Sequence, residues 1–292
     1  MPPRPTAACG TMYWESTHDY DPVWAKCVQL GVAPTLHGGS RGMGLRKSPS
    51  NFVYNHIGHF AAASEATCKA LFLGGVTRRF PKLNFAFLEG GVGWACTLYS
   101  DLIGHWRKRN LKALEDVNPA NLNRNLLLDL IGRYAGKEYA VRYSASPEVT
   151  LGEGRTATGG LKQLDDYARC QIERAEDIRD LFCRNFYFGC EADDPVNAWA
   201  FDRRVNPFDA QLKTLLGSDI GHFEVTDLSE VLLEEYEPVE RGLINEDQFK
   251  EDQFKEFVFA NPVRFWGEGN PGFFSGTVVE GAASKLLSEP IS

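Results

Sequence analysis

The sequence of 292 residues is short of positive charge, of long apolar runs and of paired cysteines. Its formal net charge of -8 argues against a nucleic-acid surface, which requires a basic face. No apolar run reaches the roughly 18 residues of a membrane span. The seven cysteines are odd in number and contain no CxxC pair, so they predict neither a disulfide framework nor a zinc knuckle. We therefore expect a cytoplasmic protein with reduced thiols that binds neither nucleic acid nor membrane.

The composition is that of a globular protein with a substantial core, because 43% of the residues are hydrophobic and 12% are aromatic. Residues 1–20 are rich in proline and have no periodicity, which is typical of a flexible start. We expect one main domain over residues 21–275 and a tail over 276–292.

Apolar spacing predicts helices along most of the chain. Residues 60–73 form an alanine-rich run closed by two glycines, and residues 94–109 place apolar side chains four positions apart. By the same reasoning we expect further helices over 21–30, 120–134, 161–182, 209–214, 226–236 and 246–260.

Four short apolar runs between these helices are typical of strands, and each ends in a polar residue. The runs cover 32–36, 84–88, 185–190 and 215–216, and the polar residues that follow are His37, Glu89, Glu191 and Asp219. Strands that alternate with helices indicate an α/β fold with a parallel sheet, either doubly wound or a barrel. In such a fold the four polar residues meet at one edge, where sites usually lie.

The stretch from Leu215 to His222 carries the strongest functional pattern. A strand there delivers Asp219 at its carboxyl end, and His222 follows three residues later on a glycine turn. A carboxylate and an imidazole in this arrangement can bind a ligand or transfer a proton. The alternative is that Asp219 is only the N-cap of the next helix.

Other candidate site residues are less specific. His56 and His59 lie three residues apart near the start of a helix, where they can contact a substrate or belong to a metal site, or can be ordinary polar residues. The cluster of Glu191, Asp193 and Asp194 either takes part in the site or faces solvent in a loop.

Four runs of this sequence together resemble the amidohydrolase-related family, in the branch of aminocarboxymuconate-semialdehyde decarboxylase. They are the segment from Tyr20 to Gly39, the segment from Arg79 to Gly91, the tripeptide Gly217-Ser218-Asp219, and the segment Phe259-Ala260-Asn261-Pro262. The resemblance covers residues 20–275 in the same order and is weakest over 110–160.

The resemblance implies a TIM-type (β/α) barrel with a divalent metal at the carboxyl ends of its strands. By position, His37 resembles the metal-binding histidine of the fifth strand and Asp219 the metal-binding aspartate of the eighth. Zinc is the expected ion and manganese the alternative, and Asp219 would also act as a general base. His222 would orient Asp219 or touch substrate, and His56 and His59 would contact substrate.

Two departures from the family pattern affect this expectation. Glu89 stands where the family has a histidine, so a general-acid role there requires a protonated carboxyl, unless His56 or His59 supplies an imidazole. No His-x-His pair precedes His37, so the chain matches only the second half of a barrel, strands 5–8 with their helices.

Two functions from different classes follow. The first is a metal-dependent hydrolase or decarboxylase, a lyase, that acts on a small carboxylate-bearing or cyclic substrate through Asp219, Glu89 and His222. The second is a catalytically inactive half-barrel that persists as an interaction module or a non-functional fragment. The unpaired edges of a half-sheet invite association with another chain, so a homo-oligomer is a further expectation.

Overall fold

The computed structural model describes residues 18–38, 48–118, 121–145, 165–222, 225–245 and 252–289. Contacts divide the chain into two units, one formed by Met1–Ile103 with Arg169–Ser292 and the other by Gly104–Ala168. The sheet and all the candidate site residues belong to the first unit. Helix α5 (Gly93–Arg109) begins in the first unit and ends in the second.

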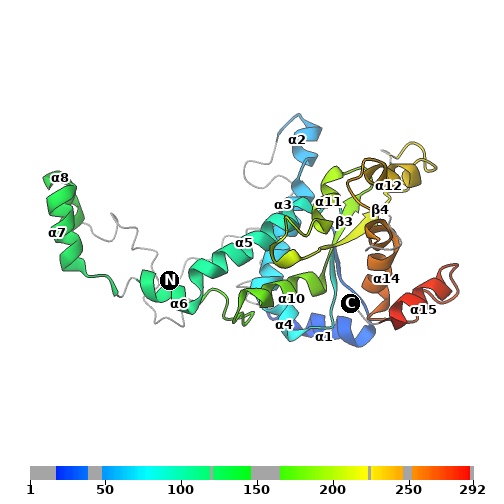
Figure 1. Ribbon diagram of the computed structural model, residues 1–292, viewed down its shortest axis with the longest axis horizontal. Helices are drawn as coiled ribbons and strands as arrows, with labels where there is room; N and C mark the ends of the chain where they lie inside the picture. Colours follow the sequence, from blue (N-terminus) through cyan, green and yellow to red (C-terminus); the bar gives the residue numbers. More distant parts are fainter. Residues whose placement is uncertain are drawn as a thin grey trace. The chain divides into compact units, whose positions relative to one another are not determined.

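A parallel sheet of four strands forms the centre of the first unit (Figure 1). The strands are β1 (Thr35–Leu36), β2 (Phe85–Phe87), β3 (Phe186–Glu191) and β4 (Lys213–Gly217), and they lie side by side in chain order. All three pairings are parallel, which confirms the predicted α/β class and all four strand positions. Among the described residues the sheet is open, with β1 and β4 at its edges, so barrel closure stays a prediction.

Helices surround this sheet in the first unit and make up the second. The first unit contains α1 (Asp21–Leu30), α2 (Phe52–His56), α3 (His59–Leu73), α4 (Val76–Arg79), α10 (Ala175–Asn185), α11 (Ala198–Phe201), α12 (Val231–Glu240), α13 (Gln253–Lys255), α14 (Asn261–Gly267) and α15 (Glu280–Ser288). Short turns of other helix types lie at Pro195–Asn197, Pro207–Asp209 and Glu256–Ala260. The second unit adds α6 (Leu111–Val117), α7 (Arg124–Tyr134) and α8 (Lys137–Ala145).

One face of the sheet is a layer of phenylalanines covered by α3 and α10. Phe182 of α10 makes ring contacts with Phe186 and Phe188 of β3, and Phe72 of α3 packs against Phe182 in turn. All four side chains are fully buried. Because neighbouring residues of a strand point to opposite faces, this layer uses alternate positions of β3.

The opposite face of the sheet is covered by α14. Tyr187 lies between Phe186 and Phe188 and points the other way, so that its ring packs on Phe265 of α14 with centroids 5.1 Å apart. Leu215 and Ala86 complete this buried cluster. With both faces buried, the strands read as continuous apolar runs, which is why the sequence pattern identified them.

Several predicted helices differ from the structure. Residues 161–182 were expected as one helix, but turns occupy 166–171 and α10 begins only at Ala175, with 161–164 outside the described residues. The helix predicted over 209–214 is wrong, since β4 begins at Lys213. The helix predicted over 226–236 begins later, at Val231. Of the helix predicted over 246–260, residues 246–251 lie outside the described part, and a short helix and a π-helical turn occupy 253–260.

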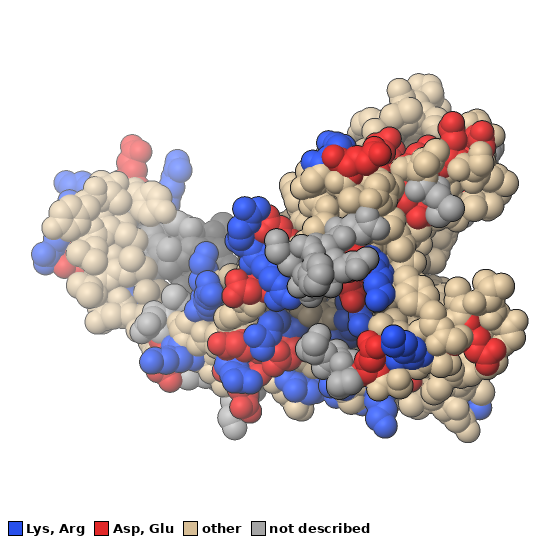
Figure 2. Space-filling model, turned by 45° about the vertical axis from the view of Figure 1, so that its right-hand side comes forward, with Lys and Arg blue, Asp and Glu red and all other residues tan. Residues whose placement is uncertain are grey.

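Three more expectations can be compared with the described residues. The segment 276–292, expected as a tail, contains helix α15, while nearly all of the start, residues 1–17, lies outside the description. None of the described helices combines the length and the apolar character that crossing a membrane requires. On the face shown in Figure 2, acidic side chains lie interspersed with basic ones.

Candidate functional site at the carboxyl edge of the sheet

The carboxyl ends of the four strands place the predicted polar residues along one edge. His37 follows β1 and Glu89 follows β2, Glu191 is the last residue of β3, and Asp219 lies two residues beyond β4. Because the strands are parallel and adjacent in chain order, these four positions come to the same edge of the sheet. The backbone topology alone therefore brings together residues that are up to 182 positions apart.

Glu89, Asp219 and His222 form the tightest polar cluster at this edge. One ligand atom from each lies within 4.8 Å of the others. Glu89 and Asp219 are partly buried and His222 is exposed, so the cluster opens to solvent on the histidine side. These are the three residues that the sequence nominated for catalysis, and the structure brings all of them together.

His37 contacts Glu89 and lies outside this three-residue cluster. The two atoms His37 Nε2 and Glu89 Oε2 are 2.8 Å apart, although the angles do not make a regular hydrogen bond. About half of the His37 side chain is exposed, against 14% of Glu89. The sequence predicted His37 as a metal ligand, and the structure places it against one of the clustered carboxylates.

The turn after β4 is built to present Asp219 and His222 together. The backbone N–H of His222 donates to the carbonyl of Asp219 at 2.9 Å, and His222 Nδ1 lies 4.0 Å from Asp219 Oδ2. No described helix begins after Asp219 until Val231, whose N-cap is Glu230, so the alternative role of Asp219 as an N-cap is wrong.

Both clustered carboxylates sit on backbone in the left-handed region, with φ of 56° at Glu89 and 48° at Asp219. Residues other than glycine rarely adopt this conformation, which costs about 1 kcal/mol or more. Left-handed residues of this kind concentrate at functional sites, where the surrounding structure holds them in place.

Glu191 belongs to the same acidic environment. Burial raises the pKa of its carboxyl, and the negative charges of Asp193, Asp219, Asp194 and Glu89 raise it further. Asp194 has a structural role as well, because its Oδ1 accepts a hydrogen bond from Val196 N and caps a helical turn. The sequence allows two interpretations of Glu191, a residue of the site or a solvated residue of a loop. Its closeness to Glu89 and Asp219 favours the first.

His56 and His59 lie beside the cluster without joining it. The ring of Phe60 connects them to His37, since its centroid is 5.2 Å from that of His37 and 4.0 Å from that of His59. His56 stacks on Phe52 and also contacts His59. These rings form an aromatic wall (Phe52, His56, His59 and Phe60) next to His37. Nothing in the local sequence singles out Phe60, because one phenylalanine at the start of an apolar helix is ordinary.

The fold and the site define a class: an α/β protein whose parallel sheet carries a carboxylate–histidine cluster at its carboxyl edge. The sequence matches no protein-family model and shows no significant similarity to a curated protein. The assignment of function therefore rests on the site itself.

Proposed function

We propose that this protein is a metal-dependent enzyme that hydrolyses or decarboxylates a small carboxylate-bearing or cyclic substrate. The observation that carries the proposal is the convergence of Glu89, Asp219 and His222 within 4.8 Å at the carboxyl edge of a parallel sheet. The resemblance of four sequence runs to the amidohydrolase-related family points to the same chemistry.

The donor atoms at this edge suit a divalent cation. Two carboxylates and one imidazole are the oxygen and nitrogen ligands that zinc and manganese accept. The like charges of Glu89, Asp219 and Glu191 oppose one another, and a cation would offset that repulsion. Glu89, Asp219 and His222 would hold the metal, which would act as a Lewis acid toward a substrate oxygen.

Neighbouring residues position the three side chains that would hold the metal. His37 holds Glu89 from the side of β1, and the turn from Asp219 to His222 fixes the carboxylate and the imidazole relative to each other. Contacts of this kind commonly change metal affinity by about 10- to 100-fold when they are removed.

Asp219 would accept a proton in hydrolysis, and Glu191 would donate one in decarboxylation. In hydrolysis the Asp219 carboxylate accepts a proton from the water that attacks the substrate carbonyl. In decarboxylation the bond to the carboxylate carbon breaks, carbon dioxide leaves, and the electron pair that remains on carbon takes up a proton. Glu191 is suited to supply that proton, since burial and neighbouring carboxylates raise its pKa.

The aromatic wall supports a cyclic substrate. Phe52 and Phe60 offer apolar ring surface, and His56 and His59 can donate hydrogen bonds to a carboxylate or a carbonyl. His56 and His59 both contact Phe60, whose ring in turn contacts His37 on the β1 side of the cluster.

An interaction module without catalysis is the second candidate, and the open sheet favours it. Both β1 and β4 pair on one side only among the described residues, so each edge leaves backbone groups that another strand can meet. In this reading the acidic edge persists without a metal. The two functions differ in whether the protein turns over substrate.

The test is a turnover assay on protein incubated with zinc or manganese chloride. Proton release from a panel of lactones reports hydrolysis, and carbon dioxide release from cyclic carboxylic acids reports decarboxylation. The proposal expects activity that falls by about 100-fold or more in Asp219→Asn. An Asp180→Asn variant, which changes an exposed carboxylate on α10, should keep full activity. Activity that survives equally in both variants, or none with either metal, would contradict the proposal.

A further inference from the structure

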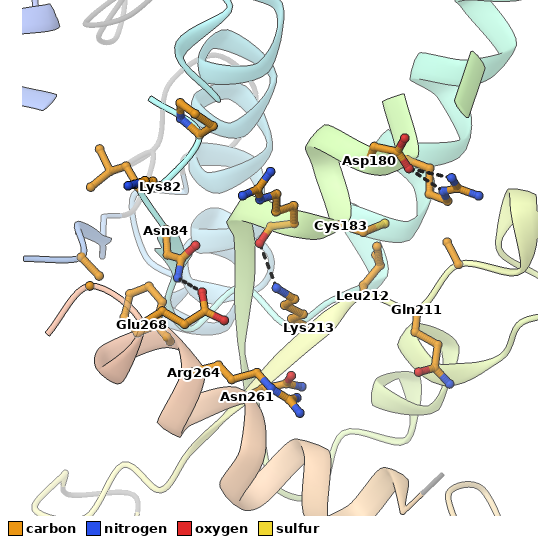
Figure 3. Close-up of a pocket in the computed structure, with 18 of the residues that line it drawn as sticks. Lys82, Asn84, Asp180, Cys183, Gln211, Leu212, Lys213, Asn261, Arg264 and Glu268 are labelled. Atoms are coloured by element: carbon orange, nitrogen blue, oxygen red, sulfur yellow. Dashed lines mark hydrogen bonds and ion pairs between the residues drawn. The ribbon is translucent and has the colours of Figure 1, made fainter. Parts of the chain in front are cut away.

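A cavity lies at the opposite edge of the sheet from the candidate site, where the strands begin. Its volume is about 1030 Å³, and its lining includes the residues just before or at the start of each strand: Ala33, Asn84, Arg184 and Lys213. The candidate site described above occupies the carboxyl edge, so the two share no residue. Figure 3 shows this amino-edge cavity with Lys213 between Glu268 and Leu212.

The charge of the amino-edge cavity is opposite in sign to that of the chain as a whole. Six of its lining residues are lysine or arginine and four are aspartate or glutamate, in a protein of net charge -8. Lys82 and Arg184 are exposed in its lining, and neither has an ion-pair partner among the described residues. A cavity with this balance attracts anions into an otherwise acidic molecule.

Most of the deeper charges already have partners. Arg264 Nη1 lies 2.6 Å from Glu256 Oε2, and Glu268 accepts a hydrogen bond from Asn84 at 3.0 Å. Arg179 pairs with Asp180. The two ion pairs leave little net charge to a ligand, whereas Glu268 keeps its negative charge because the amide of Asn84 is neutral.

Lys213 is the exception. Its ammonium donates to the carbonyl of Arg184 at 2.8 Å and to the hydroxyl of Tyr187 at 3.2 Å, and it lies 4.6 Å from the centroid of the Tyr187 ring. These contacts are all with neutral groups, and the described residues place no carboxylate at ion-pair distance from it. Burial lowers the pKa of Lys213, and the negative charge of Glu268, which lies beyond ion-pair distance, offsets part of that shift.

Part of the remaining cavity wall is apolar. Phe265 and Leu212 are buried at its inner side, and Val28 and Val32 line it with more than 40% of each residue exposed. Phe208 and Asp209, also in the lining, both adopt positive φ, at 59° and 52°. Two successive non-glycine residues in the left-handed backbone region indicate a locally strained wall, as do Glu89 and Asp219 at the carboxyl edge.

We propose that the amino-edge cavity binds a small organic carboxylate with one negative charge and an apolar body, anchored by Lys213. Lys213 supplies one positive charge, which matches one carboxylate, whereas the second charge of a phosphate dianion would find the other deep cation, Arg264, already paired with Glu256. The apolar body of the ligand packs against the valine and phenylalanine walls. A bound carboxylate favours the charged form of Lys213, so binding at alkaline pH should be accompanied by proton uptake.

The experiment is isothermal titration calorimetry of the full chain with benzoate, and with benzamide as its uncharged isostere. The proposal expects saturable binding of benzoate and a loss of about ten-fold or more with benzamide or in Lys213→Met. Lys213→Arg keeps the charge and should retain more affinity than Lys213→Met. A Lys26→Met variant on the surface of α1 is the matched control and should bind as the unchanged protein does. Far-ultraviolet circular dichroism confirms that each variant is folded.

Two further measurements keep the result decisive if Lys213→Met does not fold. Titration at alkaline pH in two buffers of different ionisation enthalpy should show proton uptake, and Arg184→Gln should weaken binding by several-fold. An absence of saturable binding, or affinity for inorganic phosphate equal to that for benzoate, would overturn the proposal. So would binding that Asp219→Asn abolishes and Lys213→Met leaves unchanged, because benzoate would then occupy the carboxyl edge.

Discussion

His37 Nε2 lies 2.8 Å from Glu89 Oε2 and links the carboxyl ends of two neighbouring strands, β1 and β2. A carboxylate oxygen of Glu89 in turn lies within 4.8 Å of ligand atoms of Asp219 and His222, which follow β4, the last strand of the sheet. The contact therefore belongs to a chain of side chains that spans the whole carboxyl edge.

His37→Ala should weaken metal binding without abolishing it. The imidazole positions Glu89 from the side, and loss of such a contact typically raises the dissociation constant for the metal by about 10- to 100-fold. Calorimetric titration with zinc chloride measures the change. His105→Ala, which alters a histidine of α5, is the control and should leave the affinity unchanged. Complete loss of binding would instead make His37 a ligand, as the family resemblance implies.

Glu89→Gly should stabilise the fold while it removes a ligand. Glycine adopts the positive φ of this position without steric cost, so we expect the free energy of unfolding to rise by about 1 kcal/mol. Urea denaturation measures it. Glu191→Gly is the matched control: it also removes an acidic group from this edge but ends β3 without a positive φ, so its free energy of unfolding should lie about 1 kcal/mol or more below that of Glu89→Gly. A lower stability in both variants would show that Glu89 carries no backbone strain.

Both faces of the sheet should contribute to stability to a similar extent. Phe182 and Phe265 are fully buried on opposite faces, so truncation of either to alanine should cost about 3–5 kcal/mol. Phe273, which is 46% exposed, should cost less than either when it is truncated. Thermal unfolding of the three variants measures the difference. A negligible effect of Phe265→Ala would mean that α14 does not cover the sheet in solution.

Glu235→Gln should stabilise the protein at neutral pH and not at acidic pH. Burial raises the pKa of Glu235 in the folded protein above its ordinary value of 4.5. At pH values between the unfolded-state pKa and the folded-state pKa, the folded state therefore holds more protons than the unfolded state. Stability therefore falls as pH rises through this window, and the charged carboxylate is a full cost at pH 7. The amide avoids that cost, with a gain of about 1 kcal/mol.

Urea denaturation at pH 7 and at about pH 4 measures the gain from Glu235→Gln and its loss on acidification. The neighbouring Glu234 is exposed, so Glu234→Gln should change stability little at either pH. An equal gain in the two variants at pH 7 would point to helix propensity in place of burial.

The strands were predictable because burial on both faces leaves a simple signal, a short run of aromatic and apolar residues. The helix over 161–182 was predicted too long for a reason that lies elsewhere in the chain. The guanidinium of Arg78 donates to the carbonyls of Cys170 and Gln171 at 3.1 and 2.9 Å, and Gln171 adopts a φ of 52°. A contact across more than 90 residues leaves no periodicity in the local sequence.

The residues of the candidate site were predictable from the sequence, but which of their side chains contact one another was not. Strand ends nominated His37, Glu89 and Asp219, since a parallel sheet brings such positions to one edge. That His37 meets Glu89, while His222 completes the cluster with Asp219, depends on the left-handed backbone at the two carboxylates. The local sequence around Lys213 does not favour a strand either. The lysine lies inside the protein because its ammonium packs over the ring of Tyr187 in the neighbouring strand β3.

The most direct test of the central claim is the metal content of the purified protein, measured by inductively coupled plasma mass spectrometry. The proposal predicts close to one zinc or manganese per chain, and about ten-fold less or lower in Asp219→Asn, with both proteins folded by circular dichroism. Protein that is free of metal and takes up none from added zinc or manganese would contradict it. The acidic edge would then be a remnant without a cation, and the interaction module would be the better account.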